Sequence, residues 1–500
     1  MQSESFDVLI IGAGLSGIGA AYHLQAQCPD KRYAILEARE AIGGTWDLFR
    51  YPGVRSDSDM YTLGYSFRPW RQAKAIADGA AILDYIRDTA REYGIEHQIR
   101  YQHRVVGAAW SSAEAQWTVE VECGPQRERR TLRCNFLYLC SGYYRYAAGY
   151  TPDFAGVEQF RGRLVHPQQW TPDIDYAGKR VVVIGSGATA VTLVPAMAKR
   201  AAHVTMLQRS PTYILSLPDQ DAIANTLRAL LPARLAYALT RWKNVLFGMA
   251  FFQLCRRAPG LVRKLLRARV QRALGPGYDV DTHFNPHYKP WDQRLCLVPN
   301  GDLFDAIRAG RAEVVTDHIE RFTEHGIRLR SGRELDADVV VTATGLQLEV
   351  LGGIAFAVDD QAFAVDDQPV DFAKTLSYKG MMCSGVPNLA FAIGYTNASW
   401  TLKCDLSSEF VCRLIEHMDR HGYRQCVPLR RDPSIAEEPL IDFSSGYVQR
   451  AIARFPKQGS RAPWKLHQNY ALDVLTLRHG RLDDGVLQFS APAAAATAAS

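Results

Sequence analysis

Asp7-Val-Leu-Ile-Ile-Gly-Ala-Gly-Leu-Ser-Gly17 is an apolar run that ends in a glycine-rich turn, and this stretch decides the fold. Apolar residues at helical spacing follow it, and a second apolar run occupies residues 33–36. These segments predict one β-α-β unit. The same order recurs around an apolar run at 180–184 and another at 203–207. Two such units indicate two nucleotide-binding domains.

Each turn has the glycine spacing that a dinucleotide pyrophosphate requires. The first glycine allows the tight turn, the second lets the backbone approach the phosphates, and a small third residue lets helix and strand pack. The helix N-terminus then favours the anion through its unpaired N–H groups and its dipole. The candidate residues are Gly12, Gly14, Ser16 and Gly17 in the first turn, and Gly185, Ser186, Gly187, Ala188, Thr189 and Ala190 in the second. Two tight turns without a ligand are the alternative.

The residue at the end of the second strand distinguishes the two units. Glu37 stands there in the first unit, where a carboxylate can accept hydrogen bonds from ribose hydroxyls but would repel a 2′-phosphate. Arg209, followed by Ser210, stands there in the second unit, and a guanidinium suits a 2′-phosphate. The first site therefore predicts FAD and the second NADPH.

We predict an α/β fold with two Rossmann-like dinucleotide-binding domains and a helical insertion. Apolar runs at 137–142 and 338–345 have the pattern of strands that return to the first and second sheets. The expected boundaries are residues 1–145 and 370–490 for a discontinuous FAD domain, 150–220 and 290–350 for the NADP domain, 221–289 for the insertion and 491–500 for a disordered tail. A duplicated heptad at 356–362 and 363–369 predicts a local hairpin or loop expansion.

One segment carries the positive charge of the chain. Residues 222–278 contain eleven Lys or Arg and no Asp or Glu, whereas the whole chain has a formal net charge of +6. Helical spacing with breaks at Pro232, Pro259 and Gly275 predicts a packed helical subdomain with a solvated basic face. Its aromatic side chains (Trp242, Phe247, Phe251 and Phe252) suggest hydrophobic substrates. Because the charge is local, a nucleic-acid partner is disfavoured.

The ten cysteines have no paired spacing. No C-x-x-C occurs, and none lies between Cys28 and Cys123, where a disulfide reductase would carry its reactive pair. The usage fits a reducing cytoplasm and predicts no metal site. The start of the chain leads directly into a strand, and the longest apolar candidate, 245–252, is shorter than a membrane span. We therefore expect a cytoplasmic protein.

Two further motifs resemble the type I Baeyer–Villiger monooxygenases. Phe160-Arg-Gly162-Arg-Leu-Val-His166-Pro-Gln-Gln-Trp170 matches their F-x-G-x-x-x-H-x-x-x-W fingerprint, where the related heteroatom monooxygenases usually end in Tyr. Residues 43–57 match their G-G-x-W-x4-Y-P-G-x3-D pattern. Residues 50–61, 291–301 and 394–400 look most like the ethionamide-activating subgroup. The chain departs from the fingerprint at Thr171, where Pro or Asp is usual, and in the heptad duplication.

The resemblance implies an NADPH-dependent flavin monooxygenase that uses O2. It would insert one oxygen atom into ketones, giving esters or lactones, and would also oxidise sulfides through a C4a-(hydro)peroxyflavin. Both cofactors would meet in a cleft between the two domains. A heteroatom (S or N) monooxygenase or an NADPH oxidase that forms no ester is the alternative within enzymes. A membrane-surface interaction protein that uses residues 222–278, peripheral on the inner face of the membrane, is the alternative of another class.

The resemblance also assigns roles to single residues. Arg294 aligns with the catalytic arginine of the family and would contact NADP; the alternative is an ordinary ion-pairing arginine. Asp57 would pair with Arg294 and reach FAD; the alternative is a turn residue. Trp46 would pack near the flavin or serve as a core aromatic. The backbone of Val105 would touch the adenine end of FAD. Asn397 or Ser399 would cap a helix from 397 to 414, and the N-terminus of this helix would point at the flavin. The linker residues would either be buried and hydrogen-bonded in place or take part in domain movement; they are Phe160, Gly162, His166 and Trp170.

Overall fold

The computed structural model describes residues 4–359, 361–362 and 371–491. Its larger sheet has nine strands in the order β18-β17-β4-β5-β6-β1-β2-β3, with β21 paired to β6. Its strands are β1 (Glu4–Ile11), β2 (Tyr33–Leu36), β3 (Ile99–Arg100), β4 (His103–Ser111), β5 (Gln116–Cys123), β6 (Glu128–Leu139), β17 (Ala355–Val358), β18 (Gln361–Ala362) and β21 (Leu389–Phe391). The strands β3, β2, β1, β6 and β21 run parallel, whereas β5 pairs antiparallel with β6 and β4 pairs antiparallel with β5.

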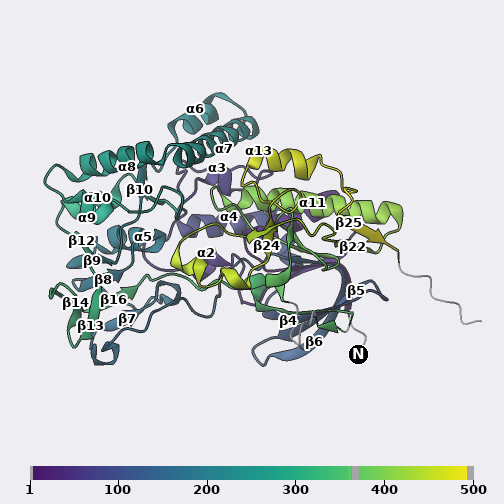
Figure 1. Cartoon of the computed structure of the whole chain (residues 1–500), viewed down its shortest axis with the longest axis horizontal. Coiled ribbons are helices and arrows are strands. Elements are labelled where there is room, and N and C mark those ends of the chain that lie inside the picture. The colour runs from purple at the N-terminus through teal and green to yellow at the C-terminus, as the bar shows by residue number, and fades with distance from the viewer. Residues whose placement is uncertain (1–3, 360, 363–370, 492–500) are drawn as a thin grey trace, which may run out of the picture.

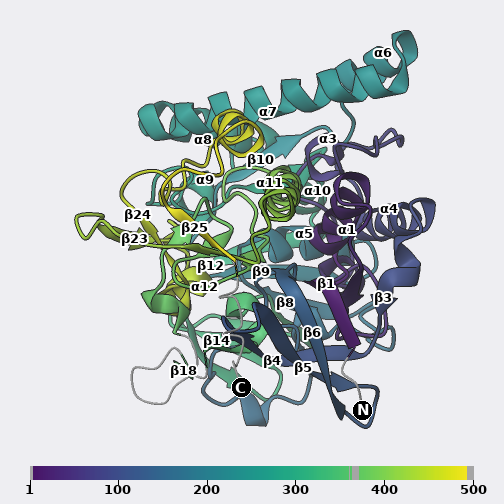
Figure 2. The ribbon, with the colours of Figure 1, turned by 90° about the vertical axis from the view of Figure 1, so that its right-hand side faces the viewer.

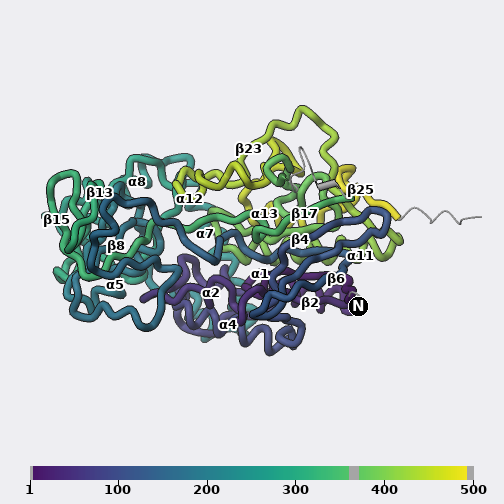
Figure 3. Tube along the Cα trace, turned by 90° about the horizontal axis from the view of Figure 1, so that it is seen from below, coloured from purple at the N-terminus to yellow at the C-terminus, as the bar shows by residue number. Residues whose placement is uncertain are grey.

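The second sheet has five parallel strands in the order β12-β9-β8-β16-β7. They are β7 (Arg163–Val165), β8 (Arg180–Ile184), β9 (His203–Gln208), β12 (Ala312–Thr316) and β16 (Val339–Thr342). Figure 3 shows the two sheets at opposite ends of the molecule. Both predicted β-α-β units are present, with helix α1 (Leu15–Gln27) in the first and α5 (Ala188–Met197) in the second. The α/β fold with two Rossmann-like units is therefore confirmed.

A long helix from the far end of the chain completes the first unit. Helix α11 (Trp400–His421) packs beside α1, and their facing side chains belong to one buried core with α4 (Gly79–Glu92) (Figure 2). The predicted helix ended at Leu414, but the buried face continues to Met418 and the helix ends only where Gly422 adopts a left-handed conformation. The end of this helix was therefore predicted one to two turns too early.

The segment 222–278 forms three helices, α6 (Ala222–Leu230), α7 (Ala233–Arg257) and α8 (Pro259–Leu274), which are interrupted at the predicted breaks. They lie along one edge of the molecule (Figure 1). The helix-breaking residues are Pro232, which precedes α7, and Gly275, which follows α8 with a φ of +92°. Among the described residues, no helix is long and apolar enough to cross a bilayer.

Shorter elements connect these parts. The helices are α2 (Thr45–Leu48), α3 (Met60–Leu63), α9 (Val280–Phe284), α10 (Asp302–Arg308), α12 (Gly446–Gln449) and α13 (Tyr470–Asp473). The remaining strands are β10 (Ile214–Leu217), β11 (Cys296–Pro299), β13 (Ile319–Thr323), β14 (Gly326–Leu329), β15 (Glu334–Asp336), β19 (Ser377–Tyr378), β20 (Met382–Cys383), β22 (Gln425–Pro428), β23 (Glu437–Pro439), β24 (Lys457–Gly459) and β25 (Leu487–Ser490).

The first copy of the duplicated heptad forms an antiparallel hairpin, β17-β18, at the edge of the larger sheet. The predicted boundaries left this segment unassigned, and its pairing with β4 places it with the first unit. The second copy and the predicted disordered tail after Ala491 lie outside the described residues. The boundaries of the nucleotide domains and of the insertion stay predictions.

Candidate active site

The first glycine-rich turn is held by contacts that leave no room for larger residues. Gly12 has a φ of +105°, and a Cβ there would lie 2.7 Å from the carbonyl oxygen of Cys140. A Cβ on Gly17 would lie 1.9 Å from the carbonyl oxygen of Gly12. Gly14 precedes the first residue of α1 and no side chain caps the helix there. The free N–H groups of the helix are therefore available to an anion.

Glu37 is 5% exposed, and its carboxylate is already oriented by the backbone. One oxygen accepts a hydrogen bond from the N–H of Ala13 (2.8 Å) and the other accepts one from the N–H of Arg39 (2.9 Å). A carboxylate has about four acceptor positions, so two remain for ribose hydroxyls. The contact with Ala13 also ties the end of β2 to the glycine-rich turn, as an adenine-nucleotide site requires.

Arg39 is a candidate site residue that the sequence analysis missed. Its guanidinium donates to the carboxylate of Asp47 (2.7 Å) and to the carbonyl of Gly44 (3.1 Å), which joins β2 to the Gly43-Gly44 turn. The Cα of Gly44 lies 3.7 Å from the position of a Cβ on Gly14, so the two glycine turns face each other closely. The only signal in the sequence was a cation two positions after Glu37, the carboxylate predicted to bind ribose.

The second glycine-rich turn is more open. Gly185 has a φ of +134°, and a Cβ there would lie 2.3 Å from the carbonyl oxygen of Ala343, whereas a Cβ on Gly187 would meet nothing within 4 Å. The Ser186 hydroxyl donates to the carbonyl of Ser210 (3.1 Å), which links the turn to the end of β9. Ala190 is fully buried against the sheet, as predicted for the third small position.

Arg209 and Ser210 are exposed beside this turn. Gly187 and Ala188, which open helix α5, are exposed on the same edge, and Thr189 is half-buried there. This edge therefore combines free helix N–H groups with a cation, the pair of features that a phosphorylated dinucleotide needs. The contact of each of these residues with NADP stays a prediction.

The predicted ion pair between Arg294 and Asp57 is present. The guanidinium binds both carboxylate oxygens, with Nε 2.8 Å from Oδ2 and Nη2 3.0 Å from Oδ1. The charge of Asp57, opposed by burial, raises the pKa of Arg294 above its usual value. About a third of each side chain is exposed (34% and 33%), so the pair lies at the edge of a cleft and not in a core. The two bonds to Asp57 hold the guanidinium of Arg294 in place, and one side of the guanidinium stays free.

Three tyrosines that spacing along the chain did not identify lie in this region. Tyr143 and Tyr447 line one cavity together with Arg294, and the hydroxyl of Tyr144 lies 2.7 Å from that of Tyr143. Burial raises the pKa of Tyr143, so its hydroxyl stays protonated at neutral pH. The ring of Tyr143 stacks on Trp400 with 4.9 Å between centroids. Because these residues are far apart in sequence, only folding brings them together.

A cavity opens beside this cluster. Its volume is about 30 Å³, and it is lined by Tyr143, Arg294, Ile393, Gly394, Tyr395, Thr396, Trp400, Leu440, Ile441, Phe443, Tyr447, Val448, Leu466 and Gln468. Most of the lining after residue 440 is apolar, whereas the polar groups gather at Arg294 and the tyrosines. An apolar wall with a few convergent polar groups is typical of a small-molecule site.

The start of α11 differs from the prediction in its capping. Ser399 occupies the cap position, but its hydroxyl lies 2.6 Å from that of Thr62 and does not cap the helix. The amide of Asn397 donates instead to the carbonyl of Gln468 (2.9 Å). Both side chains are therefore engaged by long-range partners, and the prediction that either caps the helix is wrong. The first N–H groups of α11 are left without a side-chain cap.

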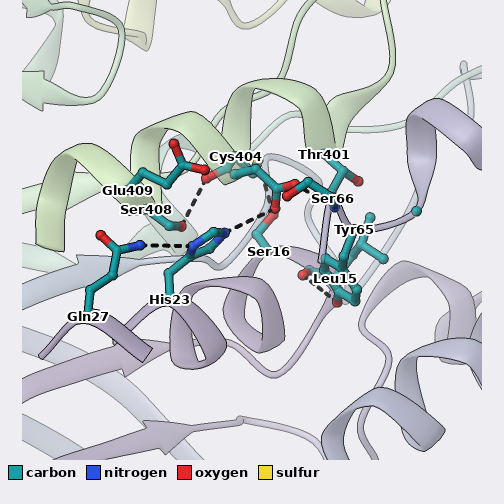
Figure 4. Close-up of polar contacts among 12 residues, drawn as sticks. Leu15, Ser16, His23, Gln27, Tyr65, Ser66, Thr401, Cys404, Ser408 and Glu409 are labelled. Carbon is teal, nitrogen blue, oxygen red and sulfur yellow. Dashed lines mark hydrogen bonds and ion pairs between the residues drawn. The ribbon is translucent and has the colours of Figure 1, made fainter. Parts of the chain in front are cut away.

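Contacts between α1 and α11 bring the first turn next to this helix start. The indole N–H of Trp400 donates to the hydroxyl of Ser16 (2.8 Å), which also lies 3.5 Å from the sulfur of Cys404. Figure 4 shows Ser16 and Cys404 facing each other between the two helices. Ser16 thus links the predicted FAD-binding turn to the residues that line the cavity. Its predicted contact with FAD stays a proposal.

The fingerprint residues form a tight connection at the edge of the second sheet. His166 accepts a hydrogen bond from the N–H of Gln168 at Nδ1 (3.2 Å), and its Nε2 lies 3.2 Å from the carbonyl oxygen of Gly345. Burial lowers the pKa of His166, which keeps the ring neutral. Trp170 is buried and packs edge-on against Tyr176. These contacts satisfy the ring of His166 and pack the Trp170 side chain; a part in domain movement stays a prediction.

The remaining predicted site residues make packing contacts. Phe160 packs edge-on against Phe322, and a Cβ on Gly162 would lie 2.7 Å from the carbonyl oxygen of Asp338. Trp46 is half-buried against the core that contains α1 and α11. Val105 lies in β4 beside a register shift, with its side chain buried. The contacts of Trp46 and Val105 with a flavin stay predictions.

All ten cysteines are buried and unpaired. Within the described ranges, no group of three or more His, Cys, Asp or Glu side chains could hold a metal ion. Burial raises the pKa of Cys140 and of Cys404, the two thiols nearest the first turn, so neither is a thiolate at neutral pH.

Comparison with known proteins identifies relatives over the whole chain. Residues 75–351 match the flavin-binding monooxygenase-like family, and residues 10–78 match an NAD(P)-binding Rossmann-like domain. The chain is 57% identical to the FAD-containing monooxygenase EthA of Mycobacterium tuberculosis strain H37Rv over 98% of each sequence. It is 48% identical to the probable FAD-binding monooxygenase AlmA of Acinetobacter baylyi, over 98% of this chain and 97% of that one.

Solved structures share the fold at low sequence identity. A steroid monooxygenase bound to NADP superimposes with a TM-score of 0.74 at 21% identity, covering 97% of this chain and 100% of that one. The monooxygenase OTEMO, in complex with FAD and NADP, superimposes with a TM-score of 0.70 at 23% identity, covering 86% of this chain and 87% of that one. The likeness extends across both sheets.

Proposed function

The chain belongs to the flavin-binding monooxygenase family of FAD-containing, NADPH-dependent enzymes, and we propose that it inserts one oxygen atom from O2 into ketones and also oxidises sulfides. The single observation that carries this proposal is the doubly hydrogen-bonded Arg294, which stands at the edge of a largely apolar cavity. A cation in that place stabilises the negative charge that develops on oxygen during attack on a carbonyl.

The residues present fit both cofactors. The first turn has glycines at Gly12 and Gly17, where a Cβ would clash with backbone atoms, and the carboxylate of Glu37 has free acceptor positions. Both features suit FAD. The second offers an open turn at Gly187 beside the exposed Arg209, which suits NADPH. When bound, FAD supplies the redox chemistry that passes electrons from NADPH to O2. The task of the chain is to bind, orient and protect these groups.

Each residue around the cavity has a defined task in this proposal. Asp57 holds the Arg294 guanidinium by two bonds and so removes the freedom of a long side chain. The protonated Tyr143 and Tyr447 add hydroxyl groups close to that cation without adding negative charge. The apolar residues Leu440 and Phe443 exclude water and accept the hydrocarbon part of a substrate.

Product analysis under 18O2 distinguishes this reaction from its alternatives. FAD-loaded enzyme with NADPH is given a ketone and a thioether in separate reactions. We expect labelled ester or lactone from the ketone and labelled sulfoxide from the thioether. Sulfoxide without ester would instead identify a heteroatom monooxygenase, and hydrogen peroxide as the only product would identify an NADPH oxidase.

The Arg294→Ala variant tests the observation that carries the proposal. Loss of one preorganised electrostatic contact lowers kcat by about 10²- to 10³-fold in comparable sites. We expect a fall of that size in product formation, while the flavin absorbance of the purified protein is unchanged. Arg129→Ala, at an exposed arginine on β6, is the matched control and keeps the wild-type rate. Product formation at the wild-type rate by Arg294→Ala would assign the role to another residue.

A further inference from the structure

The insertion carries most of the exposed large apolar side chains in the described part of the chain. Ten of these twelve side chains lie on α6, α7 or α8. On α7 they include Leu235, Leu239, Trp242, Leu246, Phe247 and Leu254. Leu246 and Phe247 are 55% and 66% exposed, which is far more than a packed helix face would leave.

Four of these residues form a continuous stripe on one side of α7. Leu235, Leu239, Trp242 and Leu246 follow one another at intervals of three or four residues, so their side chains share one helical face. The spacing extends this face over several turns. A stripe of this length resembles the apolar face of a helix that rests on another surface.

The stripe cannot turn inward, because the opposite side of α7 is anchored. Arg241 is buried there, and its guanidinium donates to the carbonyls of Gly64 (2.7 Å) and Tyr61 (2.9 Å) and lies 3.4 Å from the carboxylate of Asp405. This anchor joins α7 to α3 and α11 in the first unit. The exposed orientation of the stripe is therefore a property of the packed protein.

Exposed cations flank the stripe. They are Arg234, Arg257, Lys264, Arg269 and Arg272, and among the described residues none of them forms an ion pair. On α8, Lys264 and Arg269 share the exposed side with Leu261 and Leu265. Since the segment 222–278 contains no carboxylate, the surface presents positive charge and apolar area together.

We propose that this surface, defined by the α7 stripe and its five flanking cations and called here the docking face, binds the surface of an anionic lipid membrane. The apolar side chains would enter the boundary between headgroups and acyl chains, and the cations would pair with lipid phosphates. A second copy of the chain is a poorer occupant, because a two-fold contact would place like charges opposite one another. The inference goes beyond the proposed chemistry and does not depend on it.

The position of the docking face allows such contact. Figure 2 shows α7 along the outer edge of the molecule, with α6 at its end and α8 beside it. The inner side of the same helix reaches the loop that carries Arg294, since Phe252 packs edge-on against Trp291 and Arg256 donates to Asp292 (3.0 Å). Membrane docking would therefore bring α7, which contacts the loop that carries Arg294, next to hydrophobic substrates dissolved in the lipid.

Vesicle co-sedimentation of the FAD-loaded protein tests the proposal. Vesicles of phosphatidylcholine alone are compared with vesicles that contain phosphatidylglycerol, at low and at high salt. We expect binding to the anionic vesicles that weakens with salt and is much lower on neutral vesicles. Wild-type protein that stays in the supernatant with anionic vesicles at low salt would overturn the proposal.

Two variants separate the two halves of the docking face. Leu246→Glu puts a charge in the apolar stripe, and Lys264→Glu combined with Arg269→Glu reverses the flanking charge; each is expected to weaken anionic-vesicle binding by about tenfold or more. Leu164→Glu, at an exposed leucine on β7, is the matched control and keeps wild-type binding. Unchanged binding by both docking-face variants would overturn the proposal, as would a dimer in solution that Leu246→Glu dissociates.

Discussion

At the scale of single residues, the two nucleotide sites differ in how tightly their turns are packed. In the first turn, Gly12 and Gly17 are enclosed by backbone atoms, so any side chain would prevent folding. In the second turn, Gly185 is enclosed but Gly187 faces open space. The packing of the protein therefore does not require glycine at position 187. A ligand that approaches the backbone closely would require it.

Gly187→Ala should separate ligand binding from stability. Its backbone conformation (φ −78°, ψ −174°) is open to alanine, so we expect a free energy of unfolding within about 1 kcal/mol of wild type. The added methyl would crowd a pyrophosphate at the start of α5, and we expect KM for NADPH to rise at least about tenfold. Gly185→Ala is the contrasting variant, because its Cβ would lie 2.3 Å from a carbonyl oxygen and should unfold the protein. Unchanged KM in Gly187→Ala would place the pyrophosphate elsewhere.

Arg209→Ala should change the choice of coenzyme. Arg209 is exposed at the end of β9, and a charge-assisted contact with the 2′-phosphate contributes about 1.5–3 kcal/mol. We expect kcat/KM for NADPH to fall by about 10- to 100-fold while that for NADH stays the same. Lys199→Ala, at the opposite end of α5, serves as the control. Equal use of NADPH and NADH by the wild type would remove this role from Arg209.

At the scale of elements, α7 depends on one buried ion pair for its place. Burial disfavours the charged form of Asp405, but His23, whose Nε2 lies 3.5 Å from Oδ1, the charge of Arg241 and the N–H of Ser66 together lower its pKa. Figure 4 shows the α1–α11 contact in which His23 takes part. The pair thus joins three helices that come from distant parts of the sequence.

Arg241→Met should loosen this junction. It keeps the stem of the side chain but removes the cation from Asp405 and the donor from two carbonyls, and breaking a buried pair costs about 3–5 kcal/mol. We expect a lower urea midpoint for unfolding, whereas Arg234→Met on the exposed side of α7 has little effect. Equal midpoints for the two variants would contradict the anchor.

The same pair predicts how stability depends on pH. Because folding lowers the pKa of Asp405, its contribution is present above the unfolded value of about 3.9 and is lost as the pH falls through the folded value. We expect the urea midpoint of the wild type to drop more steeply below pH 4 than that of Asp405→Asn. Parallel curves for the two proteins would show that this carboxylate does not titrate with folding.

At the scale of the whole molecule, the loop from Phe49 to Asp57 joins the two nucleotide units. It leaves the first unit after α2 and packs on α5 of the second, where Tyr51 is part of the buried core. A Cβ on Gly53 would lie 2.6 Å from the Cβ of Ala196, and Arg55 forms an ion pair with Asp302. Since Asp57 ends this loop, the seating of the loop on α5 sets the position of the pair with Arg294.

Gly53→Ala should therefore reduce catalysis without removing FAD. The new methyl would displace the loop from α5, and a misplacement of about 1 Å can cost about 100-fold in rate. We expect a fall of that order in flavin reduction by NADPH, followed by stopped-flow absorbance. Gly94→Ala is the matched control, because Gly94 has a similar left-handed φ (+66°) but no atom within 4 Å of a Cβ. Equal effects of the two substitutions would point to backbone strain alone.

The sequence by itself determined both β-α-β units, the two glycine-rich turns, and the charged residue that ends the second strand of each unit, Glu37 in the first and Arg209 in the second. These follow from local requirements, since steric limits on a turn and the charge at a strand end can be read within some thirty residues. It also indicated the three helices of the insertion and, by resemblance, the pair of Asp57 and Arg294. Only the tertiary structure decided what surrounds that pair, because Tyr143, Trp400 and Tyr447 meet through contacts between distant segments. The exposed side of α7 was likewise decided by packing, since the long-range anchor at Arg241 fixes which face of the helix is left to solvent.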